Sequence, residues 1–197
     1  MLSADDIKFY LSVFKELNLN DVMDLSRLSS AQRLKPGEIY IAEGSLSHQL
    51  AYIKKGLIRV FQLKPNGEEV TLMLRWEKQF IASIDGVIYN RSSRYAYQAM
   101  EETVLLAIDY KKAGDIIDVN PRLSAVRSNL LLQMLSQAMD RVEAFVMLSA
   151  EERYLKLVSE KPDIVNRVAD RHLATLLGIT PVSLSRIRKR ISAQTRH

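Results

Sequence analysis

The stretch that decides the fold of the C-terminal part is Asp170-Arg-His-Leu-Ala-Thr-Leu-Leu-Gly-Ile-Thr-Pro-Val-Ser-Leu-Ser-Arg-Ile-Arg-Lys189. It predicts two short helices joined at Gly178, because glycine readily takes the left-handed conformation of a tight turn. Thr180 and Pro181 mark the start of the second helix, since threonine caps helices and proline is tolerated at the first helical position. The two helices share apolar positions: Leu173, Leu177, Ile179, Leu184 and Ile187. Ala174 is small where they would cross. This is the helix-turn-helix pattern, whose second helix lies in the major groove of DNA.

The second predicted helix has an apolar and a basic face. At about 100° per residue, Leu184, Ile187 and Ile191 fall on one stripe. Val182, Arg186 and Lys189 fall on the opposite side, flanked by Ser185 and Arg190. An outward arginine can form bidentate bonds with guanine, and an outward valine can contact a thymine methyl group. The alternative is a solvated basic surface helix, but the capping and turn residues favour DNA binding.

The charge distribution agrees with this interpretation. The chain of 197 residues has a net charge of +5. From Arg171 to His197 there are six Arg or Lys and no Asp or Glu, which leaves a charge of −1 on the rest. A local excess of this kind is typical of a phosphate-binding surface. We therefore expect double-stranded DNA as a partner, with strongly salt-dependent affinity.

Composition excludes several classes of protein. There are no cysteines, so disulfides, thiolate metal sites, iron–sulfur clusters and cysteine nucleophiles are excluded. No apolar run approaches the ~20 residues that span a bilayer, and the N-terminus lacks a signal-peptide pattern. We expect a soluble, cytoplasmic protein without contact to a membrane.

The region between about residue 33 and residue 108 predicts an antiparallel β structure. Short apolar segments alternate with turns, of which Lys64-Pro-Asn-Gly67 is the strongest hairpin signal. The predicted strands are Ile39–Ile41, Leu50–Ile53, Leu57–Phe61, Glu69–Leu74, Tyr95–Ala99 and Thr103–Ile108. This spacing is typical of a sandwich or barrel. Before it, residues 1 to about 30 have helical spacing, carried by Phe9, Val13, Phe14, Leu17, Val22, Leu25 and Leu28, around polar breaks at Asn18 and Asn20.

A long helix is predicted after Pro121. Its coiled-coil-like stripe consists of Leu131, Leu135, Ala138, Val142 and Phe145. The stripe can pack within the monomer or against a partner, and we expect a homodimer because two-fold DNA sites match two-fold proteins. A further helix begins near Ala150.

The whole chain resembles the cyclic-AMP receptor protein/FNR family of bacterial transcription regulators. The resemblance is carried by Leu34–Gly44, Tyr52–Val60, Pro65–Val70, Ser149–Tyr154 and Gly178–Arg190. It implies an α+β fold with an N-terminal antiparallel β-barrel sensor (residues 1–120), a long dimerisation helix (121–149) and a helix-turn-helix domain (150–197). It also implies RNA polymerase as a further partner. The segment after Tyr154 is short, so we expect the β-hairpin wing of that family to be reduced or missing.

The resemblance gives roles to the DNA-binding residues. Its base-reading positions correspond to Pro181, Val182 and Arg186, and we expect Arg186 to read a guanine. Arg188, Lys189 and Arg190 would mostly hold phosphates. The complete set of predicted DNA-binding residues is Thr180, Pro181, Val182, Ser183, Ser185, Arg186, Arg188, Lys189 and Arg190.

The ligand cassette of the family is degenerate here. Nucleotide-binding members carry Gly-Glu and, about ten residues later, Arg-Ser/Thr-Ala. This chain has Ala82 and Ser83 at the first place and Ser93 and Arg94 at the second. The sensor could bind cyclic AMP through Arg91 or Arg94 after a loop shift, bind another small effector, or bind none, and we predict that the effector is not cyclic AMP. No cofactor is evident.

Other functions find little support. No phosphate-binding glycine loop or nucleophile motif is present, so we expect no enzyme activity and no catalytic residues. Three histidines, His48, His172 and His197, are scattered and indicate no metal or haem site. The Glu68-Glu69, Glu101-Glu102 and Glu151-Glu152 pairs are expected to be surface charge. The alternative function is a cyclic-nucleotide-binding regulatory module that acts through protein contacts.

Overall fold

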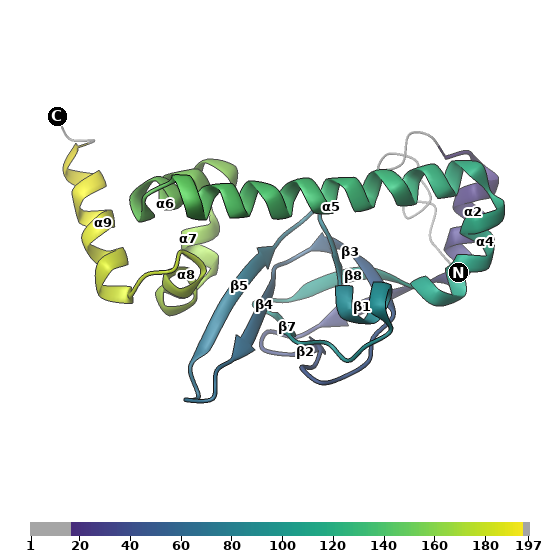
Figure 1. Cartoon of the computed structure of the whole chain (residues 1–197), viewed down its shortest axis with the longest axis horizontal. Helices are drawn as coiled ribbons and strands as arrows, with labels where there is room; N and C mark the ends of the chain where they lie inside the picture. Colours follow the sequence, from purple (N-terminus) through teal and green to yellow (C-terminus); the bar gives the residue numbers. More distant parts are fainter. Residues whose placement is uncertain (1–16, 195–197) are drawn as a thin grey trace.

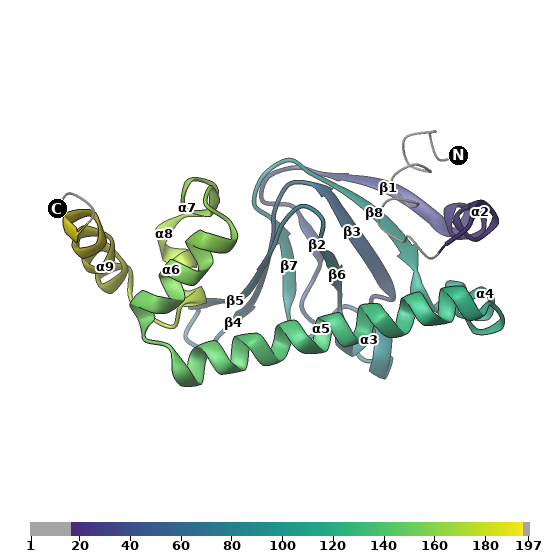
Figure 2. The same cartoon turned by 90° about the horizontal axis from the view of Figure 1, so that it is seen from above.

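One long helix organises the computed structural model, which describes residues 17–194. This helix, α5 (Pro121–Met147), runs along the molecule with two β-sheets on one side and short helices grouped at each end (Figures 1 and 2). The other helices are α2 (Leu19–Leu28), α3 (Ile84–Tyr89), α4 (Tyr110–Val119), α6 (Ala150–Glu160), α7 (Ile164–Arg167), α8 (Asp170–Leu176) and α9 (Pro181–Gln194). The predicted α+β class is confirmed.

The strands form two antiparallel four-stranded sheets. Their bounds are β1 (Ser29–Leu34), β2 (Ile39–Ile41), β3 (Gln49–Lys55), β4 (Ile58–Leu63), β5 (Glu69–Arg75), β6 (Phe80–Ala82), β7 (Ala96–Ala99) and β8 (Thr103–Asp109). The strand orders are β1-β8-β3-β6 and β2-β7-β4-β5. In the part of the chain that the structure describes, each sheet keeps two edge strands, so the sheets form an open sandwich. The predicted antiparallel β domain is confirmed, and its two sheets do not close into a barrel. The edge strands β2 and β6 are short, with three residues each.

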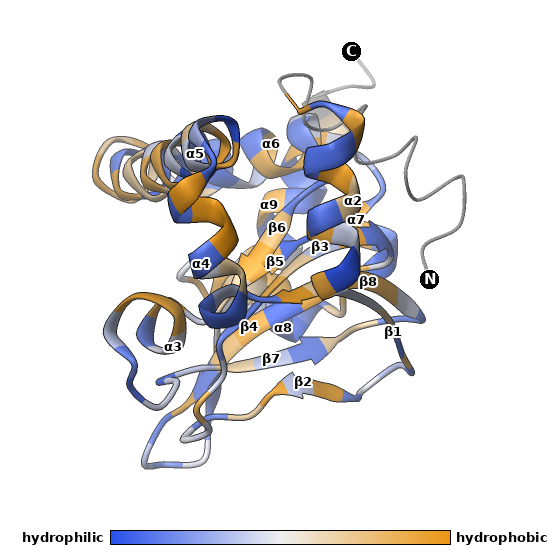
Figure 3. Ribbon diagram, turned by 90° about the vertical axis from the view of Figure 1, so that its right-hand side faces the viewer, coloured by the Kyte–Doolittle hydropathy of each residue, from blue (hydrophilic) through white to orange (hydrophobic). Residues whose placement is uncertain are grey.

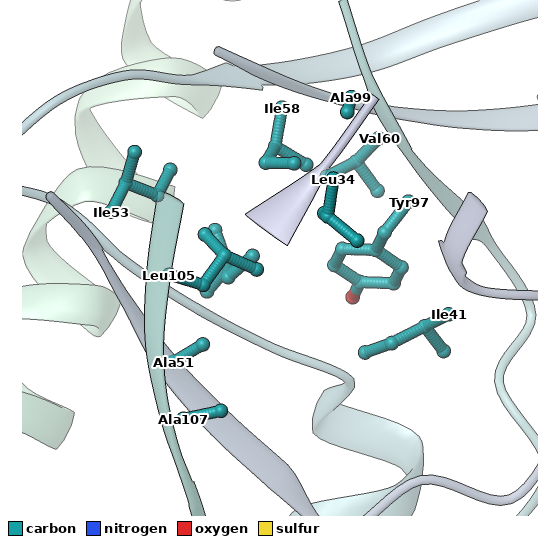
Figure 4. Close-up of a cluster of buried hydrophobic side chains, with 11 residues drawn as sticks. Leu34, Ile41, Ala51, Ile53, Ile58, Val60, Tyr97, Ala99, Leu105 and Ala107 are labelled. Atoms are coloured by element: carbon teal, nitrogen blue, oxygen red, sulfur yellow. The ribbon is translucent and has the colours of Figure 1, made fainter. Parts of the chain in front are cut away.

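The two sheets enclose an apolar core (Figure 4). Side chains alternate between the faces of a strand, and on β3 and β8 the inward positions are Ala51, Ile53, Leu105 and Ala107. The cluster is completed by Leu34, Ile41, Ile58, Val60, Ile81, Tyr97 and Ala99. The outward residues of the same strands form a second surface, which α4 and α5 cover (Figure 2).

The strand predictions are confirmed at β2, β3, β4, β5, β7 and β8 to within two residues at most ends. The pairing of β4 with β5 confirms the hairpin, which Lys64 closes through its N–H to the carbonyl of Glu68 at 2.9 Å. Strand β1 was missed because its residues, Ser29–Leu34, have little β-propensity of their own. They are held by pairing with β8.

The helices before and after the sheets differ in part from prediction. The helix predicted up to about residue 30 is confirmed as α2, while Phe9, Val13 and Phe14 lie outside the described residues. Asn18, which we interpreted as a break, instead caps α2 in a capping box with Asp21. The Asp109 side chain caps α4 by accepting from the N–H groups of Lys111 and Lys112, and this helix was not predicted.

The start of α5 is fixed by polar contacts. The Asn120 side chain accepts from the N–H groups of Arg122 and Leu123, and Pro121 takes the first helical position. The buried Asp21 carboxylate accepts from Arg122 at 2.7 Å and from Asn120 at 2.6 Å. These bonds hold the pKa of Asp21 at about 2 and tie α2 to the beginning of α5.

Candidate nucleic-acid interface

The two C-terminal helices have the predicted turn and cap. Gly178 stands between α8 and α9 with φ +71°. The Thr180 hydroxyl accepts from the N–H of Ser183 at 3.2 Å and so caps α9. A side chain at Gly178 would also approach the ring of Phe145 on α5 to 3.0 Å. The turn is therefore set both by its own backbone and by the end of the long helix.

The apolar face of α9 packs on α8 as its spacing predicts. Leu184 is fully buried, Ile187 is 7% exposed, and Leu173 and Ala174 of α8 are fully buried beneath them. Because these positions face inward, the opposite side of α9 faces away from the molecule (Figure 1).

That outward side carries the predicted base-reading residues. Val182 is 61% exposed, and Arg186 and Lys189 are exposed as well. Within residues 17–194, neither Arg186 nor Lys189 has a hydrogen bond or ion pair, so both cations are free to meet a ligand. Thr180, Pro181 and Ser185 are exposed beside them, whereas Ser183 is half-buried and bonds Thr180.

The other two cations of α9 are already paired. Arg188 donates to both carboxylate oxygens of Asp170, at 2.7 and 2.9 Å, and lies over the ring of Tyr154. Arg190 donates to Glu151 at 2.7 Å. The predicted phosphate role thus suits Lys189 better than Arg188, which holds α9 against α8. This ion pair was not predictable from local sequence, because Asp170 lies 18 residues from Arg188.

The wing that usually accompanies this motif is absent from the described part of the chain. Between α4 and Gln194 all regular structure is helical, and α6 leads through the four-residue α7 directly to α8. The helical course of this region agrees with the expectation, drawn from the short segment after Tyr154, that the wing is reduced or missing.

The residues of the degenerate cassette come together around a carboxylate that the sequence did not single out. Ala82 and Ser83 are buried, and Ser83 caps α3 through the N–H of Gly86. Asp85, in the first turn of α3, accepts from the Nε of Arg94 at 3.0 Å and from its backbone N–H at 3.2 Å. The bond from Arg94 lowers the pKa of Asp85. Ser93 is buried and donates to the carbonyl of Tyr95, while Arg91 is exposed beside the Tyr89 ring.

The contacts at these positions differ from those of the nucleotide cassette described above. The cation that would meet its phosphate, Arg94, is paired with Asp85, and no acidic side chain stands at Ala82 or Ser83 to accept from a ribose hydroxyl. The Tyr97 hydroxyl donates to the carbonyl of Ala82, and its ring fills the space between the sheets (Figure 4). An apolar pocket of about 70 Å³ lies elsewhere, between the outer face of β3 and β8 and the helices α4 and α5.

The predicted dimer stripe of α5 is exposed. Leu135 and Val142 are 59% and 55% exposed, and Ala138 is exposed between them. Leu131 and Phe145 are exposed to 38% and 42%. A neighbouring row of Leu132, Met139 and Val146 is open too, so the outer side of α5, away from the strands, carries a broad apolar face (Figure 3).

Of the glutamates predicted to be surface charge, Glu69 is exposed and accepts from Arg59 within its own sheet at 2.6 Å. Glu101 instead joins the sheets to the C-terminal helices, because it accepts from Arg167 at 2.7 Å, as does Glu77. Within residues 17–194 there is no group of three or more metal-ligating side chains. In the same range no helix has the length and apolar character that crossing a membrane requires.

Comparison with known proteins places this geometry in context. Residues 31–120 match the family described as the cyclic nucleotide-binding domain. No curated protein matches the chain. The solved structure of FixK2 from Bradyrhizobium japonicum is 15% identical with a TM-score of 0.73, and the match covers 85% of this chain and 86% of that one.

Two other solved structures match this chain over a similar length. The c-di-GMP-responsive global regulator CLP of Xanthomonas campestris is 14% identical with a TM-score of 0.70, covering 90% of this chain and 93% of its own. A protein from Eubacterium rectale, described as a transcriptional regulator of the Crp/Fnr family, is 18% identical with a TM-score of 0.71, covering 94% and 88%. The chain therefore has the fold of these Crp/Fnr regulators, and its residues 31–120 match the cyclic nucleotide-binding domain family.

Proposed function

We propose that this protein is a homodimeric, sequence-specific DNA-binding transcription regulator. The observation that carries the proposal is the outer face of α9, where Val182, Arg186 and Lys189 are exposed on a capped helix and neither cation has a partner among residues 17–194. A free guanidinium there can form two bonds with guanine, and a free ammonium can neutralise a phosphate. The likeness of the fold to Crp/Fnr regulators supports this reading.

Dimerisation is proposed to occur through α5. Its stripe of Leu131, Leu135, Ala138, Val142 and Phe145 has the spacing of a coiled coil and remains exposed. Leaving such a face in water is unfavourable, and a second copy would cover it. The pairing would also place two copies of α9 on a two-fold axis, as a palindromic DNA site requires.

The sensor is proposed to respond to an effector other than cyclic AMP, or to none. The support is the pairing of Arg94 with Asp85 and the absence of a ribose acceptor. A buried nucleotide hydroxyl without its partner costs about 1–3 kcal/mol, or roughly 5- to 150-fold in affinity.

Selection of binding sequences from a random duplex pool tests the function directly. Purified protein without added ligand should enrich a two-fold symmetric site. Enrichment that appears only with cyclic AMP would refute the proposal about the effector. Failure under every condition, with nucleotides and cell extract included, would refute DNA binding and favour a module that acts through protein contacts.

A further inference from the structure

A single buried arginine joins the sensor sheets to the helix-turn-helix. Arg59 on β4 is 1% exposed. Its Nη2 donates to Glu69 of β5 at 2.6 Å and to Gln98 of β7 at 2.8 Å. Its Nη1 bonds the Nδ1 of His172 on α8, and its guanidinium lies 4.0 Å from the centre of the Phe61 ring. One cation therefore links three strands of a sheet to the first helix of the DNA-reading unit.

The bond to His172 requires a neutral imidazole, because only an unprotonated Nδ1 can accept from a guanidinium. Burial, together with the nearby charges of Arg59 and Arg171, lowers the pKa of His172 to about 4. The acceptor is therefore present at neutral pH, and the bond lies where water does not compete for it.

The apolar core of the helix-turn-helix is also completed by the sensor. Leu57 and Leu74 belong to the same buried cluster as Tyr154, Ile164 and Leu173. Trp76 and Met100 pack against that cluster from the sensor side. The helices from α6 to α9 comprise about 45 residues, a size at which a chain segment rarely builds a sufficient core alone. The position of α8 is accordingly set by the sheet on which it packs.

Two further contacts hold α8 and the preceding helix α7 against the sensor. The Thr175 hydroxyl accepts from the N–H of Thr71 on β5 at 3.1 Å. At the other end of the interface Arg167 bonds Glu77 and Glu101, each at 2.7 Å. Burial alone would raise the pKa of Glu77, but the bonds from Arg167 and the N–H of Gly56 hold it at about 2.

We propose that Arg59 is a positioning residue for the recognition helix α9. Through His172 it holds α8 against the sensor sheet, and α9 follows because Arg188 and the shared core join it to α8. The reading face of α9 stays open in this docked arrangement, so docking presents the helix and does not cover it. This inference rests on the proposed function, since the position of α9 matters only if it reads DNA.

Trp76 reports docking without any DNA. It is the only tryptophan of the chain and lies at the interface. Arg59→Met keeps the apolar stem and removes the donors, and it should make Trp76 fluorescence more accessible to acrylamide in the full-length protein. Arg33→Met, at an exposed arginine of β1, is the matched control and should behave as wild type. Equal quenching in wild type and Arg59→Met would overturn the proposal.

A pair of changes at His172 separates positioning from folding. His172→Gln retains an acceptor and should preserve docking, whereas His172→Leu should match Arg59→Met. Each variant is then measured on the selected two-half-site duplex and on a duplex with one half-site. A positioning defect should weaken binding to the two-half-site duplex by roughly tenfold while one-half-site binding stays near wild type.

The outcomes distinguish this inference from the proposed function. If both duplexes lose affinity equally in Arg59→Met, the residue acts only on folding and the proposal is wrong. If wild-type protein binds no duplex at all, the proposed function fails, and the positioning role for α9 fails with it. The Trp76 measurement then still decides whether Arg59 docks α8.

Discussion

Replacing Arg186 by alanine should relax the base preference of this protein without weakening its fold. The side chain is exposed and has no bond to any residue between Leu17 and Gln194. Removing it should change the free energy of unfolding by no more than about 0.5 kcal/mol. A lost bidentate arginine–guanine pair costs about 1–3 kcal/mol, or roughly 5- to 150-fold, at each half-site. A dimer loses two such pairs, so the effect on a palindrome should be about twice as large in free energy.

Lys189→Ala is the comparison that distinguishes a base contact from a phosphate contact. Lys189 is equally free, but an ammonium at this position is expected to meet phosphate. Its loss should weaken binding to all sequences alike and reduce the slope of log K against log salt by about 0.9 per subunit. Lys111→Ala removes the same charge from an exposed position of α4, far from α9, and should leave the slope unchanged.

The assay is binding of each variant to the selected duplex and to duplexes with each base at the contacted position, between about 50 and 200 mM salt. Arg186→Ala should bind the four bases nearly equally at one position of each half-site. If Arg186→Ala and Lys189→Ala lose the same factor on every duplex, the division of roles on α9 is refuted.

Three further changes test other parts of the structure. Leu135→Glu places a charge in the middle of the exposed α5 stripe and should convert the dimer into monomers in sedimentation experiments. The melting temperature of the monomer should stay unchanged, because Leu135 packs on little of its own chain. A dimer that persists in this variant would show that the interface lies elsewhere. Gly86→Ala would place a Cβ 1.9 Å from the Ser47 carbonyl oxygen and should cost about 1–3 kcal/mol in urea denaturation, whereas Gly114→Ala, with open space around it, should be neutral or stabilising by up to about 1 kcal/mol. His172 should make the free energy of unfolding depend on pH. Its pKa is about 4 in the folded protein and 6.5 ordinarily, so the unfolded chain binds a proton at a higher pH than the folded protein does. The free energy of unfolding should therefore decrease by about 2 kcal/mol between pH 7.5 and 5, and the decrease should be smaller in His172→Gln.

Local sequence was sufficient to predict the helix-turn-helix, because its determinants act over a few residues. The φ of +71° at Gly178, the Thr180 cap and the burial of Leu184 and Ile187 all follow from nearest-neighbour chemistry and helical spacing. The same is true of the hairpin at residues 64–67 and of the start of α5 at Pro121. Strand β1 and the open edges of the sandwich were not predictable in this way, since they depend on pairing with strands distant in the sequence.

The sequence by itself determined the helix-turn-helix, the hairpin at residues 64–67 and the long helix after Pro121. It also determined that basic residues gather at one end of the chain and that the nucleotide cassette lacks its acidic residue. Only the tertiary structure decided which of those charges are free. Among residues 17–194, Arg186 and Lys189 remain unpaired, while Arg188 pairs with Asp170, Arg94 pairs with Asp85, and Arg59 is buried against His172, 113 residues away. Charge and spacing can be read along a chain, but the pairing of an ionic group depends on which distant carboxylate or imidazole the fold brings within hydrogen-bonding distance. That pairing is what separates the candidate DNA-reading residues of this protein from those that hold its two parts together.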